Sequence, residues 1–198
     1  MPLKHQYRHI ITSRFMWYAK RDVETGENLF ELFKEKKILK GAQFLTQGEQ
    51  WDTFSIVVKG MFRLYYIDED GREHTKGIFN EDRILAPCAP SAIGKPVNFS
   101  IETLEDTEIL WANYQQMRAF LESTDWGKFV LIGLLETILN EKIEREYDWL
   151  ILDAESRYLR FLSKNHNLSE RIPLYVIANY LGMTDVTLSR IRRNLDLT

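Results

Sequence analysis

The chain has 198 residues, of which 44% are hydrophobic and 28% are charged, and its net charge at pH 7 is −3. This composition excludes intrinsic disorder of the whole chain, because the apolar side chains suffice for one or two packed domains. No apolar stretch approaches the ~18 residues of a membrane helix, and the N-terminus lacks the apolar segment of a signal peptide. We therefore expect a soluble, cytoplasmic protein without a membrane segment.

The charge is distributed unevenly along the chain. Residues 41–170 contain thirteen Lys or Arg against twenty-two Asp or Glu, whereas residues 171–198 contain four against two. A positive C-terminal segment behind an acidic body indicates two modules with different electrostatic tasks. The negative net charge therefore does not exclude a nucleic acid as partner.

The N-terminal part of the chain gives weak signals. Residues 1–25 show no strong hydrophobic pattern, and we expect them to be an N-terminal extension. Residues 27–36 place four apolar side chains at helical spacing, which predicts a short amphipathic helix. These side chains are Leu29, Phe30, Leu32 and Phe33.

Short apolar runs interrupted by glycines fill residues 38–112 and predict β-strands. Residues 54–58 and 62–67 suit two strands joined by a tight bend at Gly60, and residues 68–71 suit a hairpin turn that ends on glycine. A further alternation of inward-facing residues runs through Val97, Phe99, Ile101 and Thr103. Short strands at this regular spacing predict an antiparallel barrel or jelly roll.

After a helix over residues 114–121, residues 126–152 predict one much longer helix. A helix of this size is ~40 Å long, more than a small domain needs for its own core. Its apolar stripe either packs on its own barrel or forms the seam of a dimer, in which a second chain covers the stripe. The candidate seam residues are Leu131, Leu135, Ile138, Leu139, Ile143, Tyr147 and Leu150.

The last forty residues carry the most informative pattern, which is that of a helix-turn-helix. Two helices that cross steeply need a small residue at their contact and a glycine at the turn, which Ala178 and Gly182 supply. Thr184 is placed to cap the second helix. With the small residue and the glycine, the predicted core consists of Ile177, Ala178, Leu181, Gly182, Leu188 and Ile191.

The outer face of the second predicted helix is polar and basic. An ordinary helical hairpin would show no such preference, whereas short hydroxyls and arginines are the side chains that contact phosphates and base edges. The pattern therefore favours DNA binding over a plain helical hairpin. The candidate DNA-binding residues are Thr184, Asp185, Val186, Thr187, Ser189, Arg190, Arg192 and Arg193.

From about residue 26 the chain resembles the Crp/Fnr family of bacterial transcription regulators. The family's glycine-punctuated β-roll is similar to Lys40-Gly41, Gly48-Glu49, residues 58–60 followed by Arg63-Leu-Tyr, and residues 70–73. Its helix-turn-helix is similar to Ile177-Ala-Asn-Tyr-Leu-Gly182 and Thr187-Leu-Ser-Arg-Ile191. These last two blocks are the most specific part of the resemblance.

The resemblance implies an α+β fold of three successive parts. A β-roll of the double-stranded β-helix or jelly-roll type would occupy residues 26–122 as the sensor, and a dimerisation helix residues 123–152. A winged-helix-like helix-turn-helix domain would occupy residues 153–198. The implied partners are double-stranded DNA with a pseudo-palindromic operator, a second copy of the chain, and RNA polymerase as a further candidate.

Carried over by position, the base-contacting face of the family falls on Asp185, Val186, Ser189 and Arg190. Many members have Glu at the position of Val186, so this chain lacks a carboxylate acceptor for cytosine. We therefore expect a half-site that differs from that of the best-known members.

The sensor lacks the residues that cyclic nucleotides need. The family's phosphate cassette contains a Gly-Glu pair and an arginine, but residues 79–100 contain no such pair and Val97 stands where the arginine is expected. Losing a charge-assisted bidentate contact to the cyclic phosphate argues against cyclic nucleotide binding. The single Cys88 cannot hold an iron–sulfur cluster, and it suits a packed residue better than a redox thiol. We predict no cofactor and no metal, and the effector is not identified.

Two other classes of function are alternatives to a DNA-binding regulator. A cupin-type enzyme needs histidines and a carboxylate that converge on a metal, but His5, His9, His74 and His166 are scattered, so we predict that the chain is not an enzyme. A ligand- or partner-binding β-roll module with a non-DNA helix-turn-helix is favoured by Asp185, Val186 and the low net charge. The arginines of the outer face favour DNA.

Overall fold

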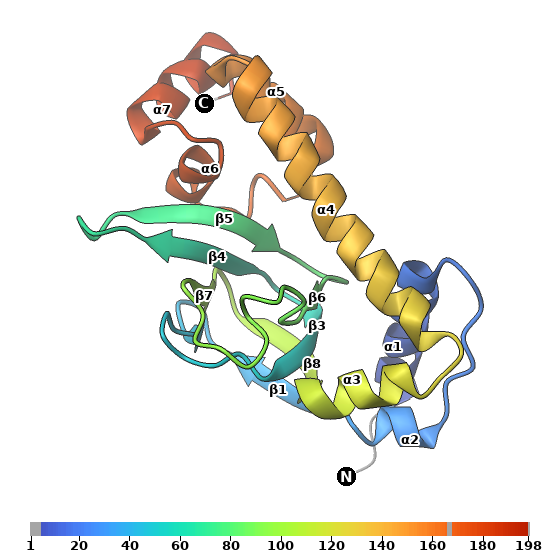
Figure 1. Cartoon of the computed structure of the whole chain (residues 1–198). Helices are drawn as coiled ribbons and strands as arrows, with labels where there is room; N and C mark the ends of the chain where they lie inside the picture. The colour runs from blue at the N-terminus through green and yellow to red at the C-terminus, as the bar shows by residue number, and fades with distance from the viewer. Residues whose placement is uncertain (1–4, 166–167, 198) are drawn as a thin grey trace. The chain divides into compact units, whose positions relative to one another are not determined.

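The computed structural model describes residues 5–165 and 168–197 and gives them an α+β fold (Figure 1). Parts of the predicted extension 1–25 and of the predicted domain 153–198 lie outside the described residues, as does His166. The helices are α1 His5–Ala19, α2 Glu27–Phe30, α3 Tyr114–Glu122, α4 Gly127–Ile151, α5 Ala154–Lys164, α6 Leu174–Tyr180 and α7 Asp185–Asn194. The strands are β1 Lys34–Ile38, β2 Gln43–Leu45, β3 Thr53–Lys59, β4 Phe62–Ile67, β5 Glu73–Phe79, β6 Ile84–Leu85, β7 Ser100–Thr103 and β8 Thr107–Asn113.

The chain divides into two compact units. The first comprises residues 1–64 and 78–138, and the second comprises residues 65–77 and 139–198. Both the β4–β5 hairpin and the long helix α4 therefore contribute residues to each unit. The domain boundaries expected from the sequence remain predictions.

The strands form two antiparallel four-stranded sheets, in the order β1-β8-β3-β6 and β2-β7-β4-β5, which together make a β-roll. The chain passes from one sheet to the other at Gly60, whose φ is +96°. A Cβ at this position would lie 2.7 Å from the Thr107 Cα, so the bend needs a residue without a side chain. The predicted roll and the predicted bend are both confirmed.

The predicted hairpin turn over residues 68–71 is also present. Gly71 has a φ of +77°, and its backbone N–H donates to the Asp68 carbonyl at 3.0 Å. The Asp68 side chain accepts from the backbone N–H groups of Asp70 and Arg72 at 3.0 and 2.9 Å. These bonds close the loop between β4 and β5.

The N-terminal residues contain the 15-residue helix α1, which their weak hydrophobic pattern did not predict. Its buried side chains Tyr7, Ile11, Phe15 and Tyr18 follow one another at helical spacing. Phe15 lies at the centre of the first unit, with its ring centroid 6.1 Å from that of Phe54 in β3 and 5.8 Å from that of Trp126. The residues before position 20 thus contribute to the hydrophobic core.

The helix predicted over residues 27–36 is only partly correct. Helix α2 ends at Phe30, and residues 34–38 form strand β1, whose Lys34 lies opposite Trp111 of β8. Pairing with a neighbouring strand outweighs the helical spacing of the local apolar residues, as tertiary context often does. Residues 34–37 are correspondingly exposed.

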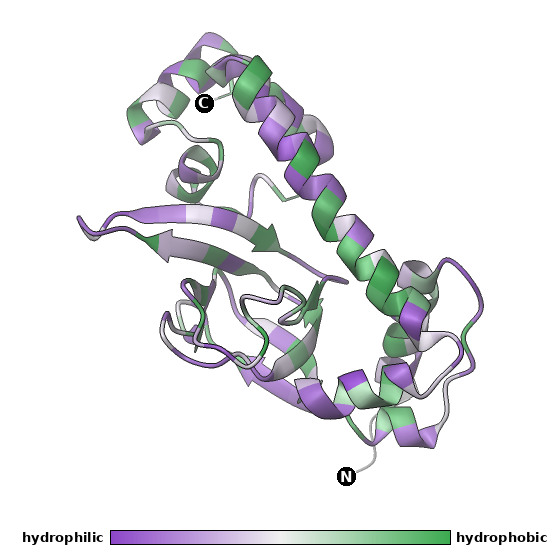
Figure 2. Ribbon diagram, viewed as in Figure 1, coloured by the Kyte–Doolittle hydropathy of each residue, from purple (hydrophilic) through white to green (hydrophobic). Residues whose placement is uncertain are grey.

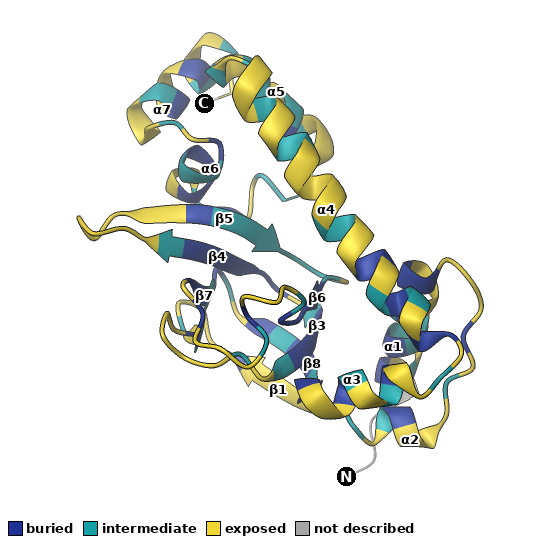
Figure 3. Ribbon diagram, viewed as in Figure 1, coloured by how far each residue is buried: buried dark blue, intermediate teal, exposed yellow. Residues whose placement is uncertain are grey.

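Helix α4 begins in the first unit and ends in the second. At Gly133 a Cβ would overlap the Tyr18 carbonyl oxygen, so the missing side chain lets α1 and α4 approach closely. The α4 residues Val130 and Leu134 are buried beside this contact. Toward its C-terminus the helix is mostly exposed (Figure 3).

The C-terminal segment contains helices α5, α6 and α7, of which the last two are the predicted helix-turn-helix. Asp153 caps α5 by accepting from the Ser156 backbone N–H at 2.8 Å. This bond lowers the pKa of the Asp153 carboxyl. Within residues 153–165 and 168–197 the structure has no strand, so the described part of this segment shows a helix-turn-helix without the expected wing.

Candidate nucleic-acid interface

The turn between α6 and α7 depends on Gly182. Its φ of +67° places it in the left-handed region, and its N–H donates to the Asn179 carbonyl at 3.2 Å. The next residue, Met183, donates from its N–H to the Ala178 carbonyl at 3.0 Å. This pair of bonds is the Schellman motif, which ends a helix and satisfies its last carbonyls. Glycine is therefore required for its backbone conformation.

Helix α7 begins at the predicted cap. The Thr184 hydroxyl oxygen accepts from the Thr187 backbone N–H at 3.2 Å, and the two threonine hydroxyls lie 2.9 Å apart. A hydroxyl cap of this kind satisfies a backbone N–H that has no partner within the helix. The sequence correctly places Thr184 at the start of the helix.

The residues predicted for the core of the helix-turn-helix are buried or lie at its turn. Its five apolar members are at most 6% exposed, and Gly182 lies at the turn. Val176 and Tyr158, which the sequence analysis did not assign to this core, are also fully buried. The buried apolar members of the predicted core are Ile177, Ala178, Leu181, Leu188 and Ile191.

The opposite side of α7 presents a stripe of four exposed residues, Val186, Ser189, Arg190 and Arg193. At about 100° per residue, the last three lie within about 60° of Val186 around the helix axis. The buried Leu188 and Ile191 lie about 140–160° away from Val186 on the same scale. We call these four residues the outer stripe of α7.

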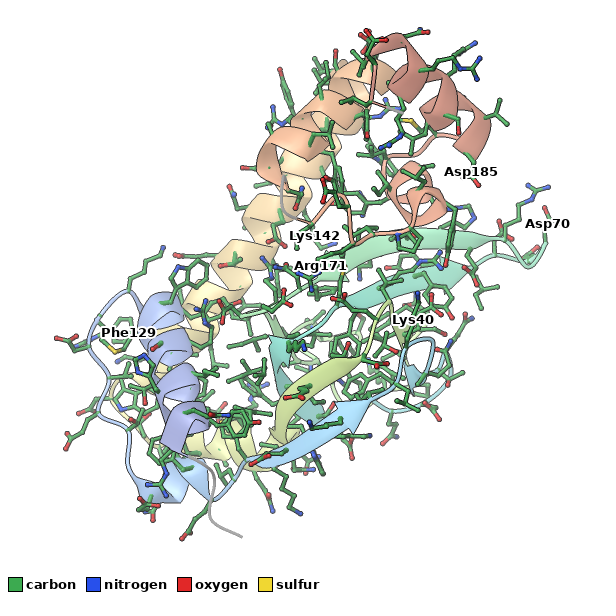
Figure 4. All side chains as sticks on the ribbon, turned by 180° about the vertical axis from the view of Figure 1, so that it is seen from behind. Lys40, Asp70, Phe129, Lys142, Arg171 and Asp185 are labelled. Carbon is green, nitrogen blue, oxygen red and sulfur yellow. The ribbon has the colours of Figure 1, made fainter. Side chains whose placement is uncertain are left out.

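The other predicted DNA-binding residues lie outside this stripe. Asp185, at the start of α7, is exposed and is labelled in Figure 4. Thr184 and Thr187 serve the helix cap. Arg192 is held inside the fold, because it donates to the Tyr158 hydroxyl at 2.9 Å and to the Leu197 carbonyl at 2.7 Å. Its guanidinium therefore has a structural role that the sequence did not reveal.

Two arginines outside the helix-turn-helix hold its first helix in place. Arg157 of α5 donates to the Leu181 carbonyl at 2.9 Å and to the Leu152 carbonyl at 2.8 Å. Arg145 of α4 donates to the Tyr180 carbonyl at 3.3 Å. The bonds to the Leu181 and Tyr180 carbonyls fall at the C-terminal end of α6, where helix carbonyls lack backbone partners.

Arg145 also joins α6 to the β4–β5 hairpin within the second unit. Its guanidinium donates to the Thr75 carbonyl at 2.9 Å and to the Lys76 carbonyl. Its Cζ atom lies 4.7 Å from the Trp149 ring centroid and 4.6 Å from that of Tyr180. Burial among these groups lowers the pKa of Arg145 below its ordinary value.

Asn179 of α6 makes a second link to the hairpin. Its side-chain amide donates to the Glu73 carbonyl at 2.6 Å, and its side-chain oxygen accepts from the Thr75 backbone N–H. Strand β5 is at the edge of its sheet, so its outer backbone groups have no neighbouring strand. One asparagine side chain thus replaces a pair of strand-to-strand hydrogen bonds.

Helix α4 carries the predicted dimer seam, and green apolar residues recur along it in Figure 2. Five predicted seam residues are 49–74% exposed, namely Leu135, Leu139, Ile143, Tyr147 and Leu150. Leu131 and Ile138 pack against the core of the first unit instead. Ile132, which the prediction omits, is 49% exposed. The exposed apolar residues from Ile132 to Leu150 recur every three or four residues, and so form one stripe along the helix.

The interior of the roll contains a buried ion pair that the sequence analysis did not anticipate. Arg63 of β4 is 1% exposed and donates to a Glu102 carboxylate oxygen at 3.1 Å. Val97, at the position expected for the nucleotide-binding arginine, is 3% exposed and packs into the core. A signal for Arg63 existed in the sequence, since it is a charged residue within an apolar strand.

Cys88 is partly buried, and burial raises the pKa of its thiol to about 12, although the charge of Arg118 opposes this shift. A thiol with such a pKa is protonated at neutral pH and reacts slowly with oxidants. Among the described residues, no three His, Cys, Asp or Glu side chains are placed to hold a metal ion. The described helices also include none that is long and apolar enough to cross a membrane.

Comparison with known proteins supports this architecture. Residues 35–124 match the family model of the cyclic nucleotide-binding domain. No curated protein sequence matches the chain. FixK2 from Bradyrhizobium japonicum is similar in structure, with a TM-score of 0.74, 18% sequence identity, and coverage of 83% of this chain and 84% of that one.

Two further solved structures are described as regulators. The c-di-GMP responsive global regulator CLP from Xanthomonas campestris has a TM-score of 0.70 and 14% identity, and the match covers 86% of this chain and 89% of that one. A protein assigned to the transcriptional regulators of the Crp/Fnr family, from Eubacterium rectale, has a TM-score of 0.70 and 16% identity, with coverage of 92% and 86%. Residues 35–124 therefore resemble the cyclic nucleotide-binding domain, and the chain has the fold of the Crp/Fnr transcription regulators.

Proposed function

We propose that the chain is a homodimeric, sequence-specific DNA-binding transcription regulator that acts in the cytoplasm. The observation that carries this proposal is the outer stripe of α7, which exposes two arginines and a serine opposite a buried apolar face. Arginine can bind the O6 and N7 atoms of guanine through two parallel hydrogen bonds, and a serine hydroxyl can contact any base. The Crp/Fnr fold supports the same conclusion.

The exposed stripe of α4 supports the homodimer. The large apolar side chains of this stripe, from Ile132 to Leu150, are about half or more exposed. A second copy of the same helix would remove this apolar surface from water, and it would also present a second α7. Two copies of a modest basic face bind a two-fold-symmetric duplex more tightly than one copy can.

The β-roll in this proposal senses something other than a cyclic nucleotide. The match to the cyclic nucleotide-binding domain names a family and does not by itself show a ligand. Val97 has no charge to offer a phosphate, and the buried Arg63 forms an ion pair with Glu102. Freeing Arg63 for a ligand would leave the Glu102 carboxylate without this cation in a largely buried place.

A second candidate function is binding of a protein partner through α7. The observation that favours it is the exposure of Val186, which is 80%. A protein partner would bury this side chain without regard to DNA. The experiment below separates the two functions.

The test compares the wild-type chain with the Arg190→Ala variant in mobility-shift titrations at several salt concentrations. The DNA duplexes contain the promoter region of the protein's own gene. We expect Arg190→Ala to lose sequence-specific binding worth about 1–3 kcal/mol, because it removes a contact to a base edge. The charge-matched control is Arg72→Ala, which lies on the hairpin and is exposed. It should retain specific binding. Equal binding by all three proteins, or no salt-dependent binding by the wild type, would contradict the proposal.

A further inference from the structure

Val186 occupies an unusual position for an apolar residue. At 80% exposure it is the most exposed of the large hydrophobic side chains among the described residues. It also lies in the middle of the outer stripe of α7, between Ser189 on one side and Arg190 on the other, as seen around the helix axis. An isolated apolar group at the centre of a polar face suits a ligand that offers an apolar group among polar ones.

The major groove of DNA contains one apolar group of this kind. Among the base edges exposed there, only thymine carries a methyl group, and the other positions are hydrogen-bond donors and acceptors. An isopropyl side chain can pack on this methyl, but it offers no hydrogen bond to the other base edges. Val186 is the second residue of α7, and the N-terminal residues of a recognition helix are those that contact base edges.

We propose that Val186 contacts the 5-methyl group of a thymine in each half-site, next to the guanine that Arg190 contacts. This inference rests on the proposed function and names the class of DNA sequence that the stripe recognises. Val186 and Arg190 are four residues apart, so their Cα atoms are separated by about 6 Å along the helix axis. At 3.4 Å per base step along each strand, the thymine lies within about two base pairs of the guanine.

The exposure of Val186 alone would also suit a protein partner. The side chains around it argue for DNA, because Arg190, Arg193 and Ser189 together offer cations and a hydroxyl to phosphates and bases. A protein partner would have to supply carboxylates for both arginines. A loss of affinity when one methyl group is removed from the DNA distinguishes DNA from a protein partner at Val186.

The experiment begins with selection of bound sequences from random duplexes by the full chain. Each thymine of the enriched half-site is then replaced by deoxyuridine, which removes only the 5-methyl group. Replacing the contacted thymine in one half-site should weaken binding by the wild-type protein about fourfold. Replacing it in both half-sites should weaken binding about fifteenfold. Val186→Ala should bind the thymine and deoxyuridine duplexes with equal affinity.

The matched control is Leu159→Ala, which truncates an exposed apolar side chain of α5, outside the outer stripe. This variant should retain the fourfold dependence on the methyl group. An enriched sequence without thymine near the guanine, or an equal loss in wild type and Val186→Ala, would overturn the inference and leave the proposed function standing. Failure to enrich any sequence would overturn the proposed function and the inference together.

Discussion

At the scale of single residues, three arginines close together on α7 have different roles. Arg190 and Arg193 are exposed on the outer stripe, whereas Arg192 donates to the Tyr158 hydroxyl and to a carbonyl near the C-terminus. The sequence predicts DNA contacts for all three, because spacing alone cannot show which guanidinium has an internal acceptor. The buried Tyr158 hydroxyl is that acceptor.

This difference predicts unequal effects on stability for two neighbouring substitutions. Arg192→Ala should destabilise the folded chain by about 1–2 kcal/mol, because it leaves the buried Tyr158 hydroxyl without this donor. Arg193→Ala should leave the free energy of unfolding nearly unchanged, since its side chain is exposed. Chemical denaturation followed by fluorescence measures both. Equal stability of the two variants would show that the bond to Tyr158 contributes nothing.

Cys88 gives a prediction about pH. Because burial raises the pKa of its thiol from 9.0 to about 12, the folded chain keeps the thiol protonated where an unfolded chain would ionise it. The free energy of unfolding should therefore fall as the pH rises above 9, because ionisation of the thiol stabilises only the unfolded state there. At pH 8, alkylation of Cys88 should be on the order of 1,000-fold slower in the folded chain than in denaturant. Rapid labelling of the native protein would indicate an accessible, redox-competent thiol.

At the scale of elements, the sequence predicted the parts whose structure is set locally. The cap at Thr184, the turn at Gly182 and the hairpin at Gly71 all depend on residues with a specific backbone or capping role, and all three are present. The boundary between α2 and β1 was wrong because pairing with β8 determines it. Such pairing joins residues far apart in the chain, and local patterns do not report it.

Helix α1 was missed for a different reason. Its buried residues Tyr7, Ile11, Phe15 and Tyr18 do follow helical spacing, but charged and polar residues separate them and make the pattern weak. The sequence does contain one sign of this helix, which is Gly133. Its lack of a side chain makes room for the Tyr18 backbone. A glycine inside a long helix indicates that another element approaches it closely.

The contact between the hairpin and α6 predicts that these two elements are stabilised together. Arg145→Ala removes the guanidinium that bonds to the Thr75, Lys76 and Tyr180 carbonyls. We expect faster amide hydrogen exchange both in residues 73–77 and in α6, by about tenfold or more, because lost bonds favour local opening. Lys142→Ala, on the exposed part of α4, is the control and should change neither region. Faster exchange in one region alone would contradict joint stabilisation.

At the scale of the whole molecule, a negative net charge and a DNA-binding face coexist because they belong to different parts of the chain. The acidic excess lies in residues 41–170, whereas the outer stripe of α7 is positive. Few cations imply few phosphate contacts and weak non-specific binding. Affinity should therefore depend on base contacts and on the pairing of two chains.

The stripe on α4 provides a variant that tests this pairing. Ile143→Glu places a carboxylate in the middle of the proposed seam, where a second helix would bury it without a partner. Ile143 is 57% exposed in the single chain, so the substitution should not affect its folding. We expect the variant to sediment as a monomer and to retain its circular dichroism spectrum.

The most direct test of the central claim is the stoichiometry of the complex between the full chain and the duplex enriched from random sequences, measured by sedimentation. The account predicts two chains on one two-fold-symmetric duplex with half-sites about one helical turn apart, and loss of this complex for Ile143→Glu. One chain per duplex, an asymmetric enriched sequence, or no enriched sequence would contradict it.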